Sequence, residues 1–161
     1  MAKNPKLKNS RQIDFISNSK INKEISCQHL AKFSKFSFAF LQTQDNKNWK
    51  SQQLAEIFVK LANFSQFELL HWCAENIYTI YGEEYPPKSK LPKPNSIPDG
   101  VKWGRFILGS KPRLCGFVIP ENQNGQSYLI NGKTYFLDTN TFYVVFLDFE
   151  HEFWPVEKKN T

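Results

Sequence analysis

The chain has 161 residues, of which 40% are hydrophobic and 16% aromatic, and it carries a formal net charge of +6. This apolar content is sufficient for a core, which excludes global disorder and favours a single domain. Residues 1–50 hold ten Lys and Arg against three Asp and Glu, whereas the rest of the chain holds eleven against twelve. The positive charge is therefore concentrated near the N-terminus, as in a basic arm that attracts polyanions or in a merely solubilising leader.

The three cysteines, Cys27, Cys73 and Cys115, are far apart and form no C-x-x-C pair, so their spacing predicts neither a zinc site nor a redox motif. Cys73 and Cys115 lie in apolar contexts that are typical of core cysteines. The first residues lack the apolar run of a signal peptide, and no stretch approaches the roughly 18 apolar residues of a membrane span. We therefore expect a cytoplasmic protein without a membrane partner, a metal or a cofactor.

Residues 1–30 are polar and rich in Lys, Asn and Ser, and they are expected to form a largely flexible basic leader with a short helix near 11–18. A single α+β domain is expected over 31–155, followed by a tail over 156–161. Within this domain, the alternation of phenylalanines with small residues over 36–40 predicts a half-buried strand.

Two helices are expected next. Apolar residues recur at i, i+3, i+4 and i+7 in the first helix, which places them on one face: Leu54, Ile57, Phe58 and Leu61. The second helix is expected to begin at a capping box formed by Ser65 and Glu68. It is expected to continue to Ile77 or Tyr81 and to stop near Gly82, so that the two helices form a hairpin.

Residues 82–100 contain five prolines and read as an exposed connector that is neither helix nor central strand. Alternation and turn residues then predict five strands, at 102–108, 113–119, 128–130, 134–137 and 142–149. Asn131-Gly132 predicts a type I′ hairpin turn between the third and fourth of them. The expected order β-α-α-β-β-(β-β)-β gives an α+β fold, in which a helical hairpin covers one face of an antiparallel sheet of about four to six strands.

The predicted hairpin over 102–113 carries four cations, and no acid lies between residues 100 and 120: Lys102, Arg105, Lys111 and Arg113. Cations on a sheet form a fixed array for successive phosphates, and arginine adds forked donors. The alternative is an ordinary solvent-facing side of the sheet, and a one-residue change of register decides whether Arg113 shares a face with Arg105 or with Lys102. Lys88 and Lys90 of the connector are further candidate ligands of nucleic acid.

The last predicted strand leads into Asp148-Phe-Glu-His151. Strict alternation places His151 at the end of a stripe shared with Tyr143, Val145 and Leu147, and Asp148 on the other face. A histidine titrates near neutrality and is the usual proton shuttle, although a strand-end histidine without chemistry is the plainer alternative. No second ligand cluster accompanies this segment, so a metal site is not expected.

The order of elements and the segment Arg105–Ile119 resemble the RelE/ParE superfamily of bacterial toxins, in which a basic strand, a Gly-Ser turn, an arginine and an apolar strand recur. The resemblance implies a toxin that cleaves messenger RNA on the ribosome with basic residues of the sheet, and that a small antitoxin protein neutralises. Arg113 matches the arginine after the turn, Arg105 or Lys102 matches the preceding basic residues, and His151 is the nearest candidate for proton transfer.

Three hypotheses follow. The first is a metal-independent endoribonuclease of a toxin–antitoxin or phage-defence system, with Arg113, Arg105 and His151 as catalytic residues. The second is a non-catalytic module that binds nucleic acid or protein through the arm and sheet. The third is a partner-binding protein whose exposed aromatic residues, such as Trp154, pack against another chain. The first hypothesis requires Lys102, Arg105 and Arg113 to project from one surface close to His151.

Overall fold

The computed structural model of the chain describes residues 26–42 and 50–155. Most of the predicted leader over 1–30, its expected helix near 11–18 and the tail over 156–161 lie outside the described residues. The fold and the candidate sites are therefore built from the two described ranges.

The chain divides into two units, Met1–Ala31 and Lys32–Thr161. The described end of the first unit enters a short 3-10 helix, η1 (Cys27–Lys32). At the start of this helix, the Ser26 amide donates to Nδ1 of His29 at 3.1 Å and the His29 amide donates to the Ser26 carbonyl at 2.9 Å. The sheet, the α-helices and every candidate site described below belong to the second unit.

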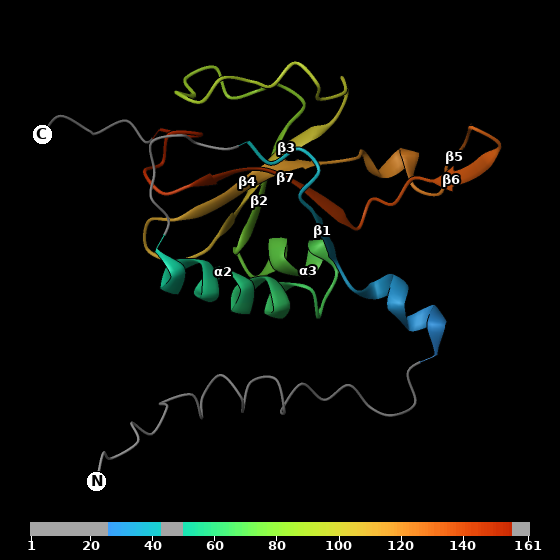
Figure 1. The fold of residues 1–161 in the computed structure, drawn as a ribbon, viewed down its shortest axis with the longest axis horizontal. Helices are drawn as coiled ribbons and strands as arrows, with labels where there is room; N and C mark the ends of the chain where they lie inside the picture. Colours follow the sequence, from blue (N-terminus) through green and yellow to red (C-terminus); the bar gives the residue numbers. More distant parts are fainter. Residues whose placement is uncertain (1–25, 43–49, 156–161) are drawn as a thin grey trace, which may run out of the picture. The chain divides into compact units, whose positions relative to one another are not determined.

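The second unit is an α+β domain (Figure 1). Five strands form one sheet in the order β1-β7-β4-β3-β2, in which the β1–β7 pair is parallel and the other pairs are antiparallel. Two helices cover one face of this sheet, and β5 pairs only with β6. The elements in chain order are β1 (Lys35–Ser37), α2 (Ser51–Phe64), α3 (Leu69–Ala74), β2 (Tyr78–Gly82), β3 (Lys102–Ile107), β4 (Arg113–Val118), η2 (Glu121–Gln123), β5 (Ser127–Ile130), β6 (Lys133–Phe136) and β7 (Thr141–Asp148).

The predicted α+β class and the helical layer on one face of the sheet are confirmed. The sheet is mixed rather than purely antiparallel, because β1 runs parallel to β7. The predicted Asn131-Gly132 turn is also confirmed, since both residues have positive φ, of 50° and 76°, as a type I′ turn requires. The β5–β6 hairpin that this turn closes does not pair with the main sheet. The sequence pattern alone did not predict which strands this hairpin would pair with.

The second helix is shorter than predicted at both ends. Ser65 ends α2, because its amide donates to the Leu61 carbonyl, and Glu68 rather than Ser65 is the N-cap of α3. At the other end Asn76 takes a φ of 57°, and residues 78–82 form β2. This segment, Tyr-Thr-Ile-Tyr-Gly, is mostly aromatic or β-branched, which favours a strand over a helix.

The apolar face of α2 is narrower than predicted. Ile57 and Leu61 are buried against the sheet, whereas Leu54 is 37% and Phe58 is 69% exposed. The buried side of α2 is therefore a single row of residues three or four apart, Ile57, Leu61 and Phe64. Phe64 completes the contact, and its ring stacks on Phe106 of β3 with centroids 4.9 Å apart.

The chain crosses from one face of the sheet to the other between Phe36 in β1 and Phe40 after it. The Phe36 ring packs on Phe106 at 5.4 Å on the helix side, whereas the Phe40 ring packs on Phe117 at 5.3 Å on the opposite side. Phe38 between them is 42% exposed. The predicted strand over 36–40 therefore ends early, at Ser37, and its three phenylalanines do not share one face.

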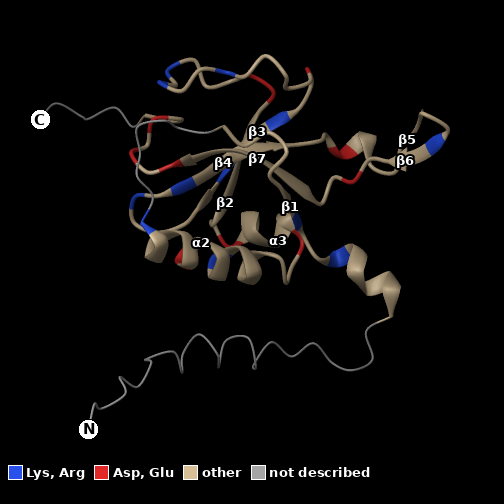
Figure 2. Ribbon diagram, in the orientation of Figure 1, with Lys and Arg blue, Asp and Glu red and all other residues tan. Residues whose placement is uncertain are grey.

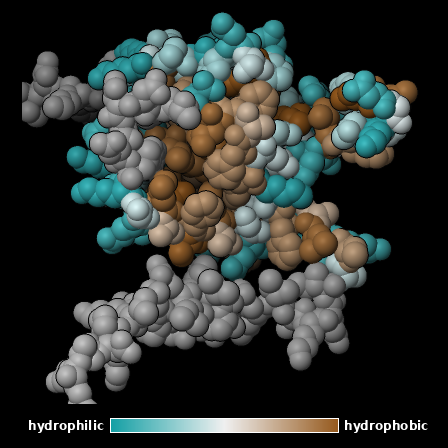
Figure 3. All heavy atoms as spheres, in the orientation of Figure 1, coloured by the Kyte–Doolittle hydropathy of each residue, from teal (hydrophilic) through white to brown (hydrophobic). Residues whose placement is uncertain are grey.

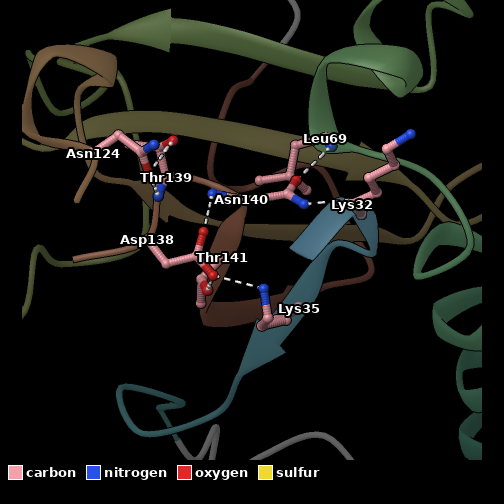
Figure 4. Close-up of polar contacts among 8 residues, drawn as sticks. All are labelled: Lys32, Lys35, Leu69, Asn124, Asp138, Thr139, Asn140 and Thr141. Atoms are coloured by element: carbon pink, nitrogen blue, oxygen red, sulfur yellow. Dashed lines mark hydrogen bonds and ion pairs between the residues drawn. The ribbon is translucent and has the colours of Figure 1, made fainter. Parts of the chain in front are cut away.

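A polar cluster at the turn before β7 joins distant parts of the domain (Figure 4). The Asp138 carboxylate forms an ion pair with Lys35 of β1 at 2.7 Å. The Asn140 side chain accepts a hydrogen bond from the Leu69 amide at 3.0 Å and donates to the Lys32 carbonyl at 3.2 Å. Asn140 therefore satisfies a free amide at the start of α3 and fixes this helix to the edge of the sheet.

The face of the sheet opposite the helices carries Arg105 and Arg113 and is called here the arginine face. The proline-rich connector covers part of it. Residues 83–100 contain no helix or strand, as predicted, but the connector is not exposed throughout. Ile97 is 6% exposed and packs in a second core with Trp103 and Phe153, both fully buried. Within the connector, the Tyr85 hydroxyl donates to the Leu91 carbonyl at 2.6 Å.

A bulge in β7 changes the faces predicted for that strand. Cys115 pairs with Phe146 and Gly116 pairs with Val144, so Val145 is an extra residue. Strict alternation over 142–153 therefore fails at this point. The side chains on the two sides of the bulge exchange faces, which places Asp148 opposite Arg113 at the end of the strand.

The β5–β6 hairpin exposes its apolar side chains. Leu129 is 75% and Phe136 is 70% exposed, and apolar atoms are visible at the outer end of this projection (Figure 3). Among the described residues, the longest helix is α2 with 14 residues, and none is long and apolar enough to cross a bilayer.

Candidate functional site

The strand register places Arg105 and Arg113 on the same face of the sheet. Arg105 lies opposite Cys115, which is two residues from Arg113 on β4, and both relations keep side chains on one face. Lys102 pairs with Val118, which belongs to the core under the helices. The prediction that Lys102, Arg105 and Arg113 project from one surface is therefore wrong for Lys102, because it is three positions from Arg105 on a strand of period two.

Arg105 has no acidic partner. Its guanidinium carbon lies 5.6 Å from the centre of the Tyr81 ring, within the range of a cation–π contact. Among the described residues the Arg105 side chain makes no hydrogen bond or ion pair, and its Nε is enclosed by protein without an acceptor. A guanidinium that is partly withdrawn from water and left without an anion favours the binding of an external anion.

Arg113 is held by the turn that precedes it. Its Nη1 donates to the carbonyls of Gly109 at 2.8 Å, Pro112 at 3.0 Å and Lys111 at 3.1 Å. Its Nε, like that of Arg105, is enclosed without an acceptor. These bonds fix the guanidinium at the end of the β3–β4 hairpin, so Arg113 contributes a rigid positive charge as well as closing the turn.

The two guanidinium groups influence each other. Burial lowers the pKa of Arg113, and the charge of Arg105 lowers it further. The repulsion between two cations on one rigid face is relieved by an anion placed between them. No ion pair with a carboxylate neutralises either arginine within the described part of the chain.

An aromatic pair borders the arginines. Tyr81 lies at a bulge of β2 and its ring stacks on Trp154, with centroids 4.1 Å apart and an interplanar angle of 3°. Burial raises the pKa of the Tyr81 hydroxyl to about 12, although Arg105 and Arg113 act to lower it. Trp154 is 37% exposed, so the outer part of this pair is open to a ligand.

Asp148 organises the loop after β7. It is 2% exposed, and its carboxylate accepts the amides of Phe153 at 2.9 Å, Glu152 at 3.0 Å and Glu150 at 3.2 Å. These bonds satisfy the buried carboxylate and leave it without an ion pair to Arg113, although the two residues lie opposite each other. Basic and acidic segments accordingly meet at this end of the sheet (Figure 2).

His151 does not end a strand, which corrects the prediction. β7 ends at Asp148, and His151 lies in the following loop with a left-handed φ of 57°. Its Nδ1 is enclosed without a hydrogen-bond partner. No hydrogen bond joins His151 to Arg105 or Arg113 within the described ranges, so the structure brings the two arginines together but does not link the histidine to them.

The predicted lysine ligands are distributed over separate segments. Lys111 lies in the β3–β4 turn and, with Lys50 and Lys60 of the α2 region, lines a groove of about 480 Å³. Lys88 and Lys90 are exposed on the connector, where the Lys90 amide donates to the Glu152 carbonyl at 2.8 Å. This bond fixes part of the connector to the loop that carries His151.

The sequence interpretation missed Tyr81 and Trp154 as parts of the site. The pattern of apolar residues predicts Tyr81 at the end of a helix, and Trp154 is predicted to contact another chain. The strand-like composition of residues 78–82 could have identified β2 and, with it, a tyrosine next to the basic hairpin. The pairing of Tyr81 with Trp154 joins segments that are more than seventy residues apart, and no local signal in the sequence indicates it.

Comparisons with protein-family models, curated proteins and solved structures give no match to this chain. Among the described residues, no group of three or more His, Cys, Asp or Glu side chains could hold a metal ion. The chemistry of the site is therefore argued from the arginine pair and its neighbours alone.

Proposed function

We propose that the arginine face binds the phosphodiester backbone of single-stranded RNA and that the protein is a RelE-like endoribonuclease of a toxin–antitoxin or phage-defence system. The observation that carries this proposal is the position of Arg105, a strand-fixed cation without an anionic partner beside a second fixed arginine. Two guanidinium groups on one rigid face match the oxygens of a phosphate. The exposed edge of the Tyr81–Trp154 pair is suited to stacking an unpaired base.

In the proposed reaction the 2′-hydroxyl of the substrate attacks the adjacent phosphorus. The bond from phosphorus to the 5′-oxygen breaks, which leaves a 2′,3′-cyclic phosphate and a free 5′-hydroxyl. Arg105 and Arg113 stabilise the negative charge that develops on the phosphoryl oxygens, in a site whose donors are already oriented. The 2′-hydroxyl releases its proton to water, while His151 donates a proton to the leaving 5′-oxygen and regains one from the solvent.

The decisive test compares Arg105→Ala with Lys102→Ala. Both variants remove one positive charge from β3, but the two side chains lie on opposite faces of the sheet. We expect Arg105→Ala to reduce RNA cleavage and growth arrest on induction by about tenfold or more, the effect of losing roughly 1.4 kcal/mol in the transition state. Lys102→Ala should keep activity close to that of the unchanged protein. Equal losses in the two variants would show that only net charge matters and would refute the arginine face.

A second candidate function, RNA binding without cleavage, is favoured by the position of His151. This histidine has no hydrogen bond to either arginine among the described residues, and Nη1 of Arg113 is occupied by turn carbonyls. Binding without turnover predicts a salt-dependent affinity that Arg105→Ala weakens, with no cyclic-phosphate product at any enzyme concentration. Detection of that product, and its loss in His151→Gln with binding retained, would decide for the endoribonuclease.

A further inference from the structure

The arginine face has a hollow lined by aromatic side chains, separate from the groove lined by Lys111. It measures about 310 Å³, at the lower end of the range of roughly 300–1,000 Å³ for small-molecule sites. Phe40, Phe117 and Tyr143 form one part of its lining, and Tyr128 of the β5–β6 hairpin forms another. The hairpin, which pairs with no strand of the main sheet, thus contributes a wall to this hollow.

The aromatic walls have two orientations. Phe117 and Tyr143 form a cross-strand pair whose rings stack on each other, with centroids 5.0 Å apart and an interplanar angle of 9°, so the pair presents ring edges to the hollow. The plane of the Phe40 ring is steeply inclined to both rings, at 65° to Phe117 and 74° to Tyr143. A planar ligand can therefore meet the edges of this pair in an edge-to-face contact, which is a favoured geometry between aromatic rings.

Two polar side chains of the hollow have no partner. Asp99 and Gln123 both line it, and neither side chain makes a hydrogen bond or an ion pair to another described residue. Asp99 lies in a tight turn before Gly100, whose φ is +76°, and this turn carries the carboxylate to the rim. Burial and then the charge of Asp138 raise the pKa of Tyr143, which keeps its hydroxyl neutral at the wall of the hollow.

We propose that this hollow binds a guanine base of the RNA strand whose phosphate the arginines hold, an inference that rests on the function proposed above. Guanine is the one standard base with two adjacent donors, N1–H and N2–H, on a single edge, and a carboxylate such as that of Asp99 accepts both. Cytosine and adenine present one amino group to a carboxylate, and uracil presents one ring N–H. The Gln123 amide can donate to O6 of the same base.

The hollow and the arginine pair lie on the same face of the sheet. Phe117 and Arg113 are four residues apart on the same face of β4, which corresponds to about 13 Å along the strand. The connector packs on this face and carries Lys90 and Lys93. A single RNA strand of a few nucleotides can therefore reach both sites.

Binding of free nucleosides to the full chain tests the base site separately from the phosphate site. The probes are guanosine, adenosine, cytidine and uridine, which carry no phosphate, and the measurement is an NMR or calorimetric titration. We expect guanosine to bind most tightly and Asp99→Asn to weaken it by about tenfold or more, the range of a lost bidentate contact. Arg105→Ala should leave guanosine binding unchanged, and Glu84→Gln serves as the matched control on an exposed acid.

The outcomes separate the two proposals. Guanosine binding without RNA cleavage would support the base site and refute the endoribonuclease, whereas cleavage without base preference would do the reverse. Equal binding of all four nucleosides, or no effect of Asp99→Asn, would overturn the guanine assignment. Tight binding of tetramethylammonium in place of nucleosides would also overturn it, since the aromatic walls and Asp99 would then form a cation site.

Discussion

Removal of the Asp148 carboxylate is expected to destabilise the domain by opening the loop after β7. Three backbone amides depend on this carboxylate, and one of them belongs to Phe153, which is fully buried in the second core. Hydrogen bonds to a charged group contribute about 1.5–3 kcal/mol each, and part of this gain offsets the cost of burying the carboxylate. For Asp148→Ala we expect a loss of about 3 kcal/mol in the free energy of unfolding, a large part of the roughly 5–15 kcal/mol of a typical domain.

Asp148→Asn should cost roughly half as much, because one amide oxygen can still accept from Glu150 and Glu152 while the NH₂ group faces the amide of Phe153. The assay is urea unfolding, with the midpoint and slope measured for both variants and for Glu84→Ala, an exposed acid without these contacts. A change below about 0.5 kcal/mol in Asp148→Ala, the range of ordinary surface substitutions, would refute this account of the loop. A larger loss of unfolding free energy in Asp148→Asn than in Asp148→Ala would also refute it.

Two further predictions concern the sheet. Gly116→Ala should destabilise the domain by about 2 kcal/mol or more, because a Cβ at this position would collide with the Tyr143 carbonyl of the neighbouring strand; unfolding with an unchanged midpoint would contradict the close approach. Tyr81 should titrate with a pKa of about 12 in absorbance at 295 nm, against about 10 in the unfolded chain, so its contribution to stability is complete below pH 10 and is lost as the pH rises towards 12. Tyr81→Phe should remove that part of the alkaline destabilisation, and an unaltered pH profile would show that Tyr81 ionises freely.

The local patterns of the sequence were sufficient for most of the elements. Alternation and turn residues located β3 to β7 within one or two residues, and Asn131-Gly132 specified the turn between β5 and β6, because these signals depend on neighbours along the chain. The boundary between α3 and β2 differs from the prediction, because the aromatic and β-branched residues over 78–82 favour a strand where helical periodicity predicts a helix. The α+β class followed from the order of the elements.

The candidate site was predictable only in part. The acid-free cluster of cations indicated an anion-binding surface, but the sequence left open whether Arg113 shares a face with Arg105 or with Lys102. Strand register decides this, and register is set by pairing between segments that the sequence alone does not align. The contacts that define the site, Tyr81 on Trp154 and Arg105 over Tyr81, likewise arise between distant segments.

The amino-acid sequence by itself therefore determined most of the helices, strands and turns, β2 excepted, and where positive charge is concentrated. Only the tertiary structure decided which cations face together, that Asp148 binds amides rather than Arg113, and that a bulge at Val145 reverses the faces of β7. The physical reason is that secondary structure follows from short-range sterics and periodicity, whereas a site depends on the side to which each residue turns, and one inserted residue is enough to reverse it.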